Sequence, residues 1–192
     1  MSGGLSTSMS NTPNRTHTSI PPPIPMHRSI YLNCLTSLKD IIRCYSHIGI
    51  VASTWDEALQ GYTMALVYIR QYNTVITTYN TYIHSKQSTQ LSQLGQHGQY
   101  HYYSDVLHAD VLYHISNVYY QMRSYRDALD EIESCVCKLK TVELSLTTNR
   151  FKHIYMLYTH ICCNLGLYSV AMEVLLKLEV IAMSGIGPVT GK

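Results

Sequence analysis

Apolar residues recur every three or four positions through most of the chain after residue 29, which is the period of an amphipathic α-helix. The clearest stretch is 112–139, where two such patterns are joined by a short turn at 122–124. Ala128 is expected where these two helices cross, because two backbones approach each other there more closely than large side chains allow. A single hairpin of this size cannot bury its own apolar face, so the pattern predicts stacked neighbours.

Helical patterns before and after this hairpin supply those neighbours. Gly49 is expected to end the first helix as a C-terminal cap. Thr54 followed by Glu57 has the spacing of a capping box, which predicts the start of the next helix. The second helix of the central hairpin is expected to reach about residue 144. The other predicted helices cover residues 30–47, 55–70, 72–86, 151–165 and 168–183.

Three stretches fall outside the helical pattern. Residues 1–28 are rich in Ser, Thr, Asn, Gly and Pro and are predicted to be a disordered tail. Residues 184–192 are predicted to be a flexible tail. Residues 85–106 are rich in Gln, Ser, His and Gly, and they are expected to form a polar insertion in a helical domain that spans 29–183. Loops of that length are uncommon inside a compact domain, so the alternative is an extra turn hidden within the segment.

An internal repeat relates three predicted hairpins once their crossing residues are aligned. The aligned crossings are Val75, Ala128 and Ala171. A tyrosine stands three positions before each crossing: Tyr72, Tyr125 and Tyr168. An apolar residue stands four positions after each crossing: Tyr79, Ile132 and Leu175.

This repeat resembles the tetratricopeptide repeat, a helix–turn–helix unit with small and aromatic residues at set positions. The second hairpin carries the likeness at Leu112, Ile115, Ser116, Tyr119, Tyr125, Ala128 and Ile132, and the third at Gly166, Tyr168, Ala171 and Leu175. The crossings are 53 and 43 residues apart, whereas the family repeats every 34 or so residues. Arg123 stands where the family has a turn glycine, and Ser116 where it has the small residue of the first helix. The resemblance implies an all-α fold of stacked helical hairpins, a TPR-like α-solenoid of about three hairpins plus an N-terminal helix. The alternative is an ordinary helical bundle whose apolar seams imitate repeats.

The order of the elements also resembles the C-terminal helical-repeat region of TRAPP complex subunit 12. The likeness consists of the Tyr-rich stretch 99–103, the sequence ALDEI at 128–132, and a last hairpin that runs into SGIG at 184–187. It implies a subunit of a membrane-tethering complex in vesicle traffic.

In the tetratricopeptide family the first helix of each hairpin lines a concave groove, and the resemblance extends that role to matching positions here. The candidate partner-binding residues are Tyr68, Tyr113, Asn117, Tyr120, Gln121, His153, Met156, His160 and Asn164. The family's cationic clamp for a peptide carboxylate is matched only at Asn117, which argues against that ligand. Tyr, Met and amide side chains suit an amphipathic helix or an extended segment. The alternative is that the chain's own N-terminal helix covers this face.

Charge and composition narrow the classes of partner. Only 14% of the residues are charged, and the chain has 17 tyrosines, a residue that suits protein interfaces. The net charge of +2 provides no basic stripe for a nucleic acid. No stretch of 18 apolar residues predicts a transmembrane segment, and the N-terminus lacks the apolar core of a signal peptide. The acid-free N-terminal tail, with Arg15 and Arg28, leaves a mitochondrial transit peptide as an alternative to a cytoplasmic location.

Residues that could carry chemistry do not form a recognisable motif. His153, His160 and Cys163 fall near one face of a predicted helix, but three ligands on one helix make a poor tetrahedral metal site. The six cysteines include no C-x-x-C pair and are expected to be reduced core residues. The sequence has no phosphate-binding glycine loop and no nucleophile elbow. We therefore expect no enzyme, no cofactor and no metal.

The resulting expectation is a non-catalytic protein–protein interaction scaffold or adaptor, a subunit of a larger complex. It would meet the membrane only indirectly, through that complex. The alternatives are an organellar RNA-associated helical-repeat protein and a metal or redox protein. No polar capping helix is predicted after the last hairpin, so an open end is expected near Tyr155, Leu175 and Leu178. Repeat arrays need polar caps for solubility, so either a partner covers this end or the chain is a fragment of a longer one.

Overall fold

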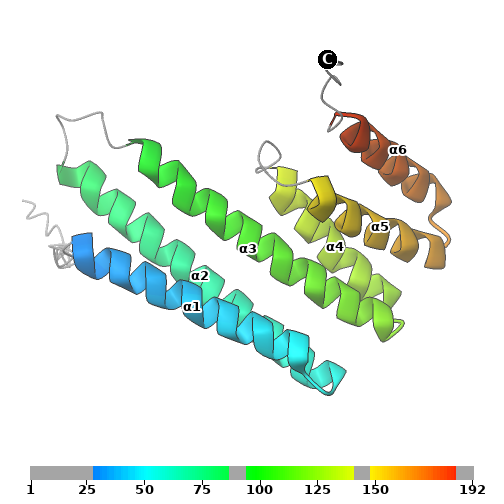
Figure 1. Cartoon of the computed structure of the whole chain (residues 1–192), viewed down its shortest axis with the longest axis horizontal. Coiled ribbons are helices and arrows are strands. Elements are labelled where there is room, and N and C mark those ends of the chain that lie inside the picture. The colour runs from blue at the N-terminus through cyan, green and yellow to red at the C-terminus, as the bar shows by residue number, and fades with distance from the viewer. Residues whose placement is uncertain (1–27, 87–93, 141–147, 185–192) are drawn as a thin grey trace, which may run out of the picture.

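The computed structural model describes residues 28–86, 94–140 and 148–184. Within these residues the chain forms six helices and no strand, which confirms the predicted all-α class (Figure 1). The helices are α1 (Arg28–Val51), α2 (Trp55–Lys86), α3 (Leu94–Gln121), α4 (Tyr125–Lys140), α5 (Thr148–Asn164) and α6 (Tyr168–Ser184).

The helices pack as three stacked hairpins. The pairs α1/α2, α3/α4 and α5/α6 are each joined by a turn of three residues. The hairpins are held to one another where α2 contacts α3 and where α4 contacts α5, and α3 also touches α5 (Figure 1). The stacked-hairpin architecture is therefore as predicted. The N-terminal helix was expected in addition to three hairpins, but α1 is itself the first helix of the first hairpin.

The predicted break in α2 is wrong. Residues 55–70 and 72–86 form one continuous helix, so Val75 is not the crossing point of a hairpin. Residues 62–86 contain neither glycine nor proline, and Ile69, Tyr72 and Ile76 continue a single buried stripe. The helix therefore has no local reason to end, and α1 rather than 72–86 packs against its first half.

The first hairpin instead crosses at two glycines. The Cβ of an alanine at Gly61 would lie 2.8 Å from the backbone nitrogen of Gly49, so the two helices touch backbone to backbone. Gly49 was expected to cap α1, but it lies inside this helix, which continues to Val51. The capping box at the start of α2 is confirmed: the amide of Glu57 donates to Thr54 Oγ1, and the amide of Thr54 donates to Glu57 Oε2, both at 3.3 Å.

The predicted polar insertion at 85–106 is also wrong in its extent. Residues 85 and 86 belong to α2, and 94–106 form the first three turns of α3. The side chain of Ser104 is buried and donates a hydrogen bond of 2.5 Å to Asn73 Oδ1 on α2. Tyr100 and Tyr103 pack against the core of the first hairpin at helical spacing, which is why this polar stretch is helical. Residues 87–93 lie outside the described part of the chain, as do most of both predicted tails and residues 141–147.

Helix α3 is shared by two cores. Its residues Val111, Ile115 and Val118 face the first core, which is formed with α1 and α2. On its other side, Ala109 and Leu112 face the second core, which is formed with α4, α5 and α6. A helix that is covered on two sides carries apolar residues around much of its circumference, and α3 connects the hairpins for this reason.

The crossing of the second hairpin lies at Ala128, as predicted. Its side chain is fully buried, and the buried hydroxyl of Ser116 donates a hydrogen bond of 2.7 Å to its carbonyl oxygen. The turn at residues 122–124 joins α3 to α4. The backbone amide of Ser124 donates to the carbonyl of Tyr119 at 2.9 Å, and Arg123 adopts a φ of 61°. This is the αL ending of a helix, which a glycine usually occupies.

Candidate binding surfaces

Eight of the nine predicted groove residues lie on the first helices of the second and third hairpins. We call this set the α3–α5 surface: Tyr113, Asn117, Tyr120 and Gln121 on α3, and His153, Met156, His160 and Asn164 on α5. The four residues on α5 are exposed, and the side chain of Met156 is 39% exposed. On α3, Gln121 is exposed and the other three are half-buried.

One ring contact joins the two halves of this surface. The rings of Tyr120 on α3 and His160 on α5 are stacked with their centroids 6.4 Å apart. Tyr120 also contacts the ring of Tyr125 at 5.6 Å, at the start of α4. The side-chain amide of Asn164 donates to the backbone carbonyl of His160 at 2.8 Å within α5.

The protonation of Tyr113 on this surface is set by burial. Burial raises the pKa of Tyr113, and the nearby Cys135 thiol adds to this shift. Tyr113 is therefore neutral at physiological pH. None of the eight residues is a lysine or an arginine, so the surface offers hydrogen bonds and aromatic rings rather than a clamp for an anion.

The ninth predicted residue, Tyr68, lies elsewhere. It is on α2, and its ring stacks on that of Tyr45 on α1 at 5.4 Å. The prediction treated residues 55–70 as a first helix, but α2 is the second helix of its hairpin. Its contact with α1 therefore turns Tyr68 away from the α3–α5 surface.

A groove of about 430 Å³ lies beside the turn between α1 and α2. It is lined by Tyr45, Ile48, Val51, Ala52, Ser53, Glu57, Gln60, Gly61 and Met64. Glu57 is already engaged, because its carboxylate accepts from the amides of Ser53 at 3.1 Å and Thr54 at 3.3 Å. Ile48, Val51 and the nearby Trp55 are about half exposed or more. The rim of this groove is therefore apolar.

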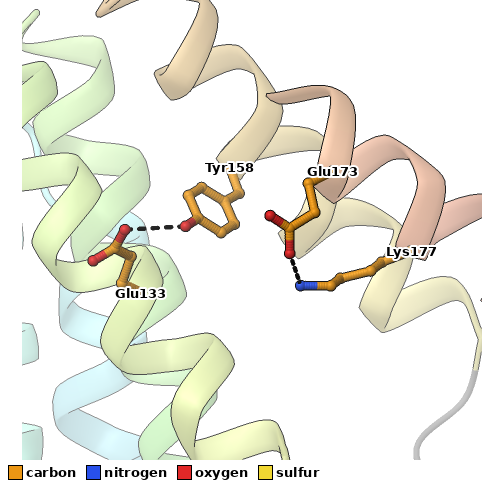
Figure 2. A network of polar contacts seen from close by, with 4 residues as sticks. All are labelled: Glu133, Tyr158, Glu173 and Lys177. Carbon is orange, nitrogen blue, oxygen red and sulfur yellow. Dashed lines mark hydrogen bonds and ion pairs between the residues drawn. The ribbon is translucent and has the colours of Figure 1, made fainter. Parts of the chain in front are cut away.

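A second groove, of about 310 Å³, lies between α4, α5 and α6, and the sequence did not predict it. Figure 2 shows Tyr158 pointing from α5 toward Glu133 on α4, while Glu173 and Lys177 pair along α6. The hydroxyl of Tyr158 donates to Glu133 Oε1 at 3.0 Å, and Lys177 Nζ donates to Glu173 Oε1 at 2.7 Å. The available signal was the spacing of these charges on α6, which are four residues apart.

These contacts favour a neutral Tyr158 and a charged Glu173–Lys177 pair. Burial and the hydrogen bond to Glu133 raise the pKa of Tyr158, so its proton stays on the hydroxyl. The ammonium of Lys177 lowers the pKa of Glu173, chiefly by donating a hydrogen bond to its carboxylate. The groove thus has polar walls of both signs and no single strong charge.

The outer face of α6 exposes large apolar side chains. They are Tyr168 and Val180, each 67% exposed, with Met172 at 58%, Leu176 at 57% and Leu175 at 41%. The expected open end is therefore found at Leu175. Leu178 is half-buried, and Tyr155 is buried in the second core.

The described thiols are buried, half-buried or exposed singly, and the described imidazoles form no metal-binding group with them. Burial, together with Asp110, raises the pKa of Cys135 to about 12, and burial also raises the pKa of Cys162. Both side chains are therefore thiols rather than thiolates. Within 28–86, 94–140 and 148–184, no three His, Cys, Asp or Glu side chains are placed to hold a metal ion. His153, His160 and Cys163 are all exposed on α5.

None of the helices in the described part of the chain has the length and apolar content needed to span a bilayer. Comparison with protein-family models, with curated proteins and with solved structures finds no match to this chain.

Proposed function

We propose that this protein is a non-catalytic interaction module, and that a helix or an extended segment of a partner protein binds across the α3–α5 surface. The observation that carries the proposal is the stacked pair of Tyr120 and His160. It brings a side chain of the second hairpin into contact with a side chain of the third. Aromatic rings and amides are typical of protein interfaces, where they supply contact area together with hydrogen bonds.

The chemistry of the surface defines the partner segment. Because the α3–α5 surface carries no cationic side chain, a terminal carboxylate or an acidic tail would find no counter-charge there. An amphipathic helix fits better, since its apolar side chains can pack on Met156 and Tyr120 while its polar groups reach Asn117 and Asn164. We therefore expect a partner helix with spaced aliphatic anchors.

The wider role follows as part of the same proposal. A low content of charged residues and many tyrosines favour a subunit that buries much of its surface in an assembly. The resemblance to TRAPP complex subunit 12 favours a tethering complex on the cytoplasmic side of a membrane. The chain would contact that membrane only through its partners.

The proposal is tested by placing a photo-crosslinking amino acid at Met156 in the full chain, in cells of its source. The matched control carries the same amino acid at Thr78, an exposed residue of α2. We expect one defined protein to be captured from position 156 and not from position 78. The captured protein is then used for binding measurements.

In those measurements, the double variant Tyr120→Ala and His160→Ala should bind the captured protein at least about tenfold more weakly, because aromatic residues often dominate binding energy. Unchanged binding by the folded double variant would refute the assignment of this surface. Capture of RNA instead of protein, with binding that weakens steeply as salt increases, would refute the protein-interaction module itself.

A further inference from the structure

Helices α4 and α6 are equivalent second helices of their hairpins. The turns before them match, since Arg123 and Gly166 both have a positive φ, and Ala128 and Ala171 are both buried. The two residues of each matched pair lie 43 positions apart, so the same shift relates every position of α4 to a counterpart on α6. The contacts of α4 therefore indicate what each face of α6 is suited to contact.

One stripe of α4 contacts the hairpin that follows it. Four side chains of this stripe line the groove between α4, α5 and α6: Glu133, Val136, Cys137 and Lys140. Glu133 also accepts the hydrogen bond from Tyr158 of α5, and Leu129, one turn earlier on α4, is buried in the second core. The third hairpin therefore stacks on the second along this stripe.

The counterpart stripe of α6 is uncovered and mostly apolar. We call its four described residues the α6 stripe: Met172, Leu176, Glu179 and Val180, at the positions that match Leu129, Glu133, Val136 and Cys137. All four are exposed, and the three apolar side chains are each more than half exposed. Figure 1 shows α6 as the last helix of the described stack, and the helix that it packs on is α5. The face by which one hairpin receives the next is therefore open at α6.

We propose that a helical hairpin of a partner protein stacks on the α6 stripe in the way that the α5/α6 hairpin stacks on α4. The stripe continues a contact that the chain already uses between its own hairpins, so a pair of helices fits it in geometry. Leu176 stands where α4 has Glu133, so the partner needs an apolar side chain there instead of a tyrosine hydroxyl. Glu179 needs a lysine or arginine of the partner opposite it, because an unpaired carboxylate is costly in an interface.

A second copy of this chain does not fit as the partner. In head-to-tail stacking the α6 stripe would meet the outer face of α1, and the exposed positions there are polar: Asn33, Thr36, Asp40, Arg43 and His47. Two α6 stripes placed face to face would bury two Glu179 carboxylates, and the stripe itself carries no cation to pair with them. Residues 185–192 are fewer than one average helix needs, so they do not supply two helices either.

The first test places a photo-crosslinking amino acid at Val180 in the full chain, in cells of its source, and maps the captured peptide by mass spectrometry. We expect one defined protein, linked through a helical hairpin that carries a lysine or arginine within about one turn of the linked residue. The matched control position is Val51, a similarly exposed valine at the end of α1. A link to a second copy, a link to another part of the same polypeptide, or no link from position 180 would overturn the proposal.

The second test measures binding of the purified captured protein. Leu176→Glu should weaken binding at least about tenfold, because the new carboxylate would be buried against apolar side chains. Ile50→Glu, which changes an equally exposed apolar residue at the α1–α2 turn, is the control and should bind as the original chain does. Both positions are exposed, so both variants should fold, and circular dichroism checks this. Full binding by the folded Leu176→Glu variant would overturn the proposal.

A charge exchange tests the register of the hairpin on the stripe. Glu179→Lys should weaken binding, and replacing the facing cation of the partner by glutamate should restore it; failure to restore binding would contradict the proposed pairing. This site does not depend on the function proposed for the α3–α5 surface, so the double variant Tyr120→Ala and His160→Ala should bind this partner normally. Binding that is lost in the double variant and kept in Leu176→Glu would place the partner on the α3–α5 surface instead.

Discussion

Arg123 adopts a backbone conformation that L-residues seldom occupy. Its φ of 61° closes the turn between α3 and α4, and Gly166, with a φ of 72°, closes the matching turn between α5 and α6. The hydrogen bonds of the two turns are equivalent: Ser124 donates to Tyr119, and Leu167 donates to Cys162 at 2.8 Å. The α5–α6 turn thus has a glycine at this position, whereas the α3–α4 turn has Arg123, which adopts the same conformation at a steric cost.

We predict that Arg123→Gly raises the free energy of unfolding by about 1 kcal/mol, because glycine adopts this φ without steric cost. Urea denaturation measures the change as a higher midpoint with an unaltered slope. Gly166→Ala is the matched control and should lower the free energy of unfolding by about the same amount. A variant Arg123→Gly that is no more stable than the original chain would contradict this account of the turn.

His108 makes the stability of the protein depend on pH. It lies on α3, its Nδ1 atom is buried, and no hydrogen-bond partner for this atom is present in the described part of the chain. Burial lowers its pKa below the ordinary value of 6.5, the positive charges of Lys138 and Arg70 lower it further, and Asp105 opposes them. The unfolded chain therefore binds a proton at His108 more readily than the folded chain does.

The sign of the pH effect follows from this difference. As pH falls below about 6.5, the unfolded state gains a proton that the folded state resists, so the free energy of unfolding decreases. We predict that His108→Gln reduces this decrease between pH 7 and pH 5, as measured by urea denaturation at several pH values. His153→Gln, which removes an exposed imidazole from α5, is the control. An equal effect of the two substitutions would show that burial of His108 is not the cause.

At the scale of the elements, the first hairpin depends on the close approach of α1 and α2 at Gly49 and Gly61. A Cβ atom at Gly61 would be 2.8 Å from the nitrogen of Gly49 and 3.1 Å from the carbonyl oxygen of Tyr45. Both neighbours are backbone atoms, which cannot rotate out of the way as a flexible side chain can. Any larger residue at this position must separate the two helices.

We predict that Gly61→Ala lowers the free energy of unfolding by about 1–3 kcal/mol, although alanine favours helix formation more than glycine does. Thermal and urea denaturation both measure this loss. The control is Thr63→Ala at an exposed position two residues further along α2, which should change stability little. If Gly61→Ala were as stable as the original chain, the two helices would not be in backbone contact in solution.

At the scale of the whole molecule, the three hairpins do not contribute equally to the cores. α3 contributes buried residues to both the first and the second core, and α1 contributes three large ones to the first: Tyr31, Leu35 and Ile42. In contrast, α6 contributes only Ala171 and Val174 to the buried set within the described residues. Stacked arrays open from the ends, where each unit has a neighbour on one side only.

We therefore predict that backbone amides exchange with solvent fastest in α6 and slowest in α3. Hydrogen–deuterium exchange read by mass spectrometry on peptides of the native chain measures the difference directly. Exchange in α3 as fast as in α6 would show that the array does not open from this end.

The helices themselves follow from local features of the sequence. Thr54 and Glu57 form the expected capping box, the turn at 122–124 lies where the pattern predicts it, and Ala128 lies at a crossing. Each depends on residues that are close in the chain. The shared surface of α3 and α5 was instead expected from the resemblance to the tetratricopeptide repeat, and it stays a prediction; the structure places the rings of Tyr120 and His160 in contact.

The pairing of the helices depends on contacts that are distant in the sequence. The hydrophobic period shows that 55–86 is apolar on one face. It does not reveal whether residues 55–70 pack against residues 72–86 or against α1. The backbone contact between Gly49 and Gly61 selects α1, which leaves α2 continuous and places Tyr68 on a different surface. The polar residues 94–106 become helical for a similar reason, since Ser104 and Tyr103 are covered by the first hairpin.

The sequence alone determined that this protein is all-α and where most of its turns lie, because helical period and capping are properties of neighbouring residues. Only the tertiary structure decided which helices form the first hairpin and which apolar face is left open at α6. An apolar stripe has the same period whether or not another helix covers it, and coverage is a matter of packing between residues far apart in the chain.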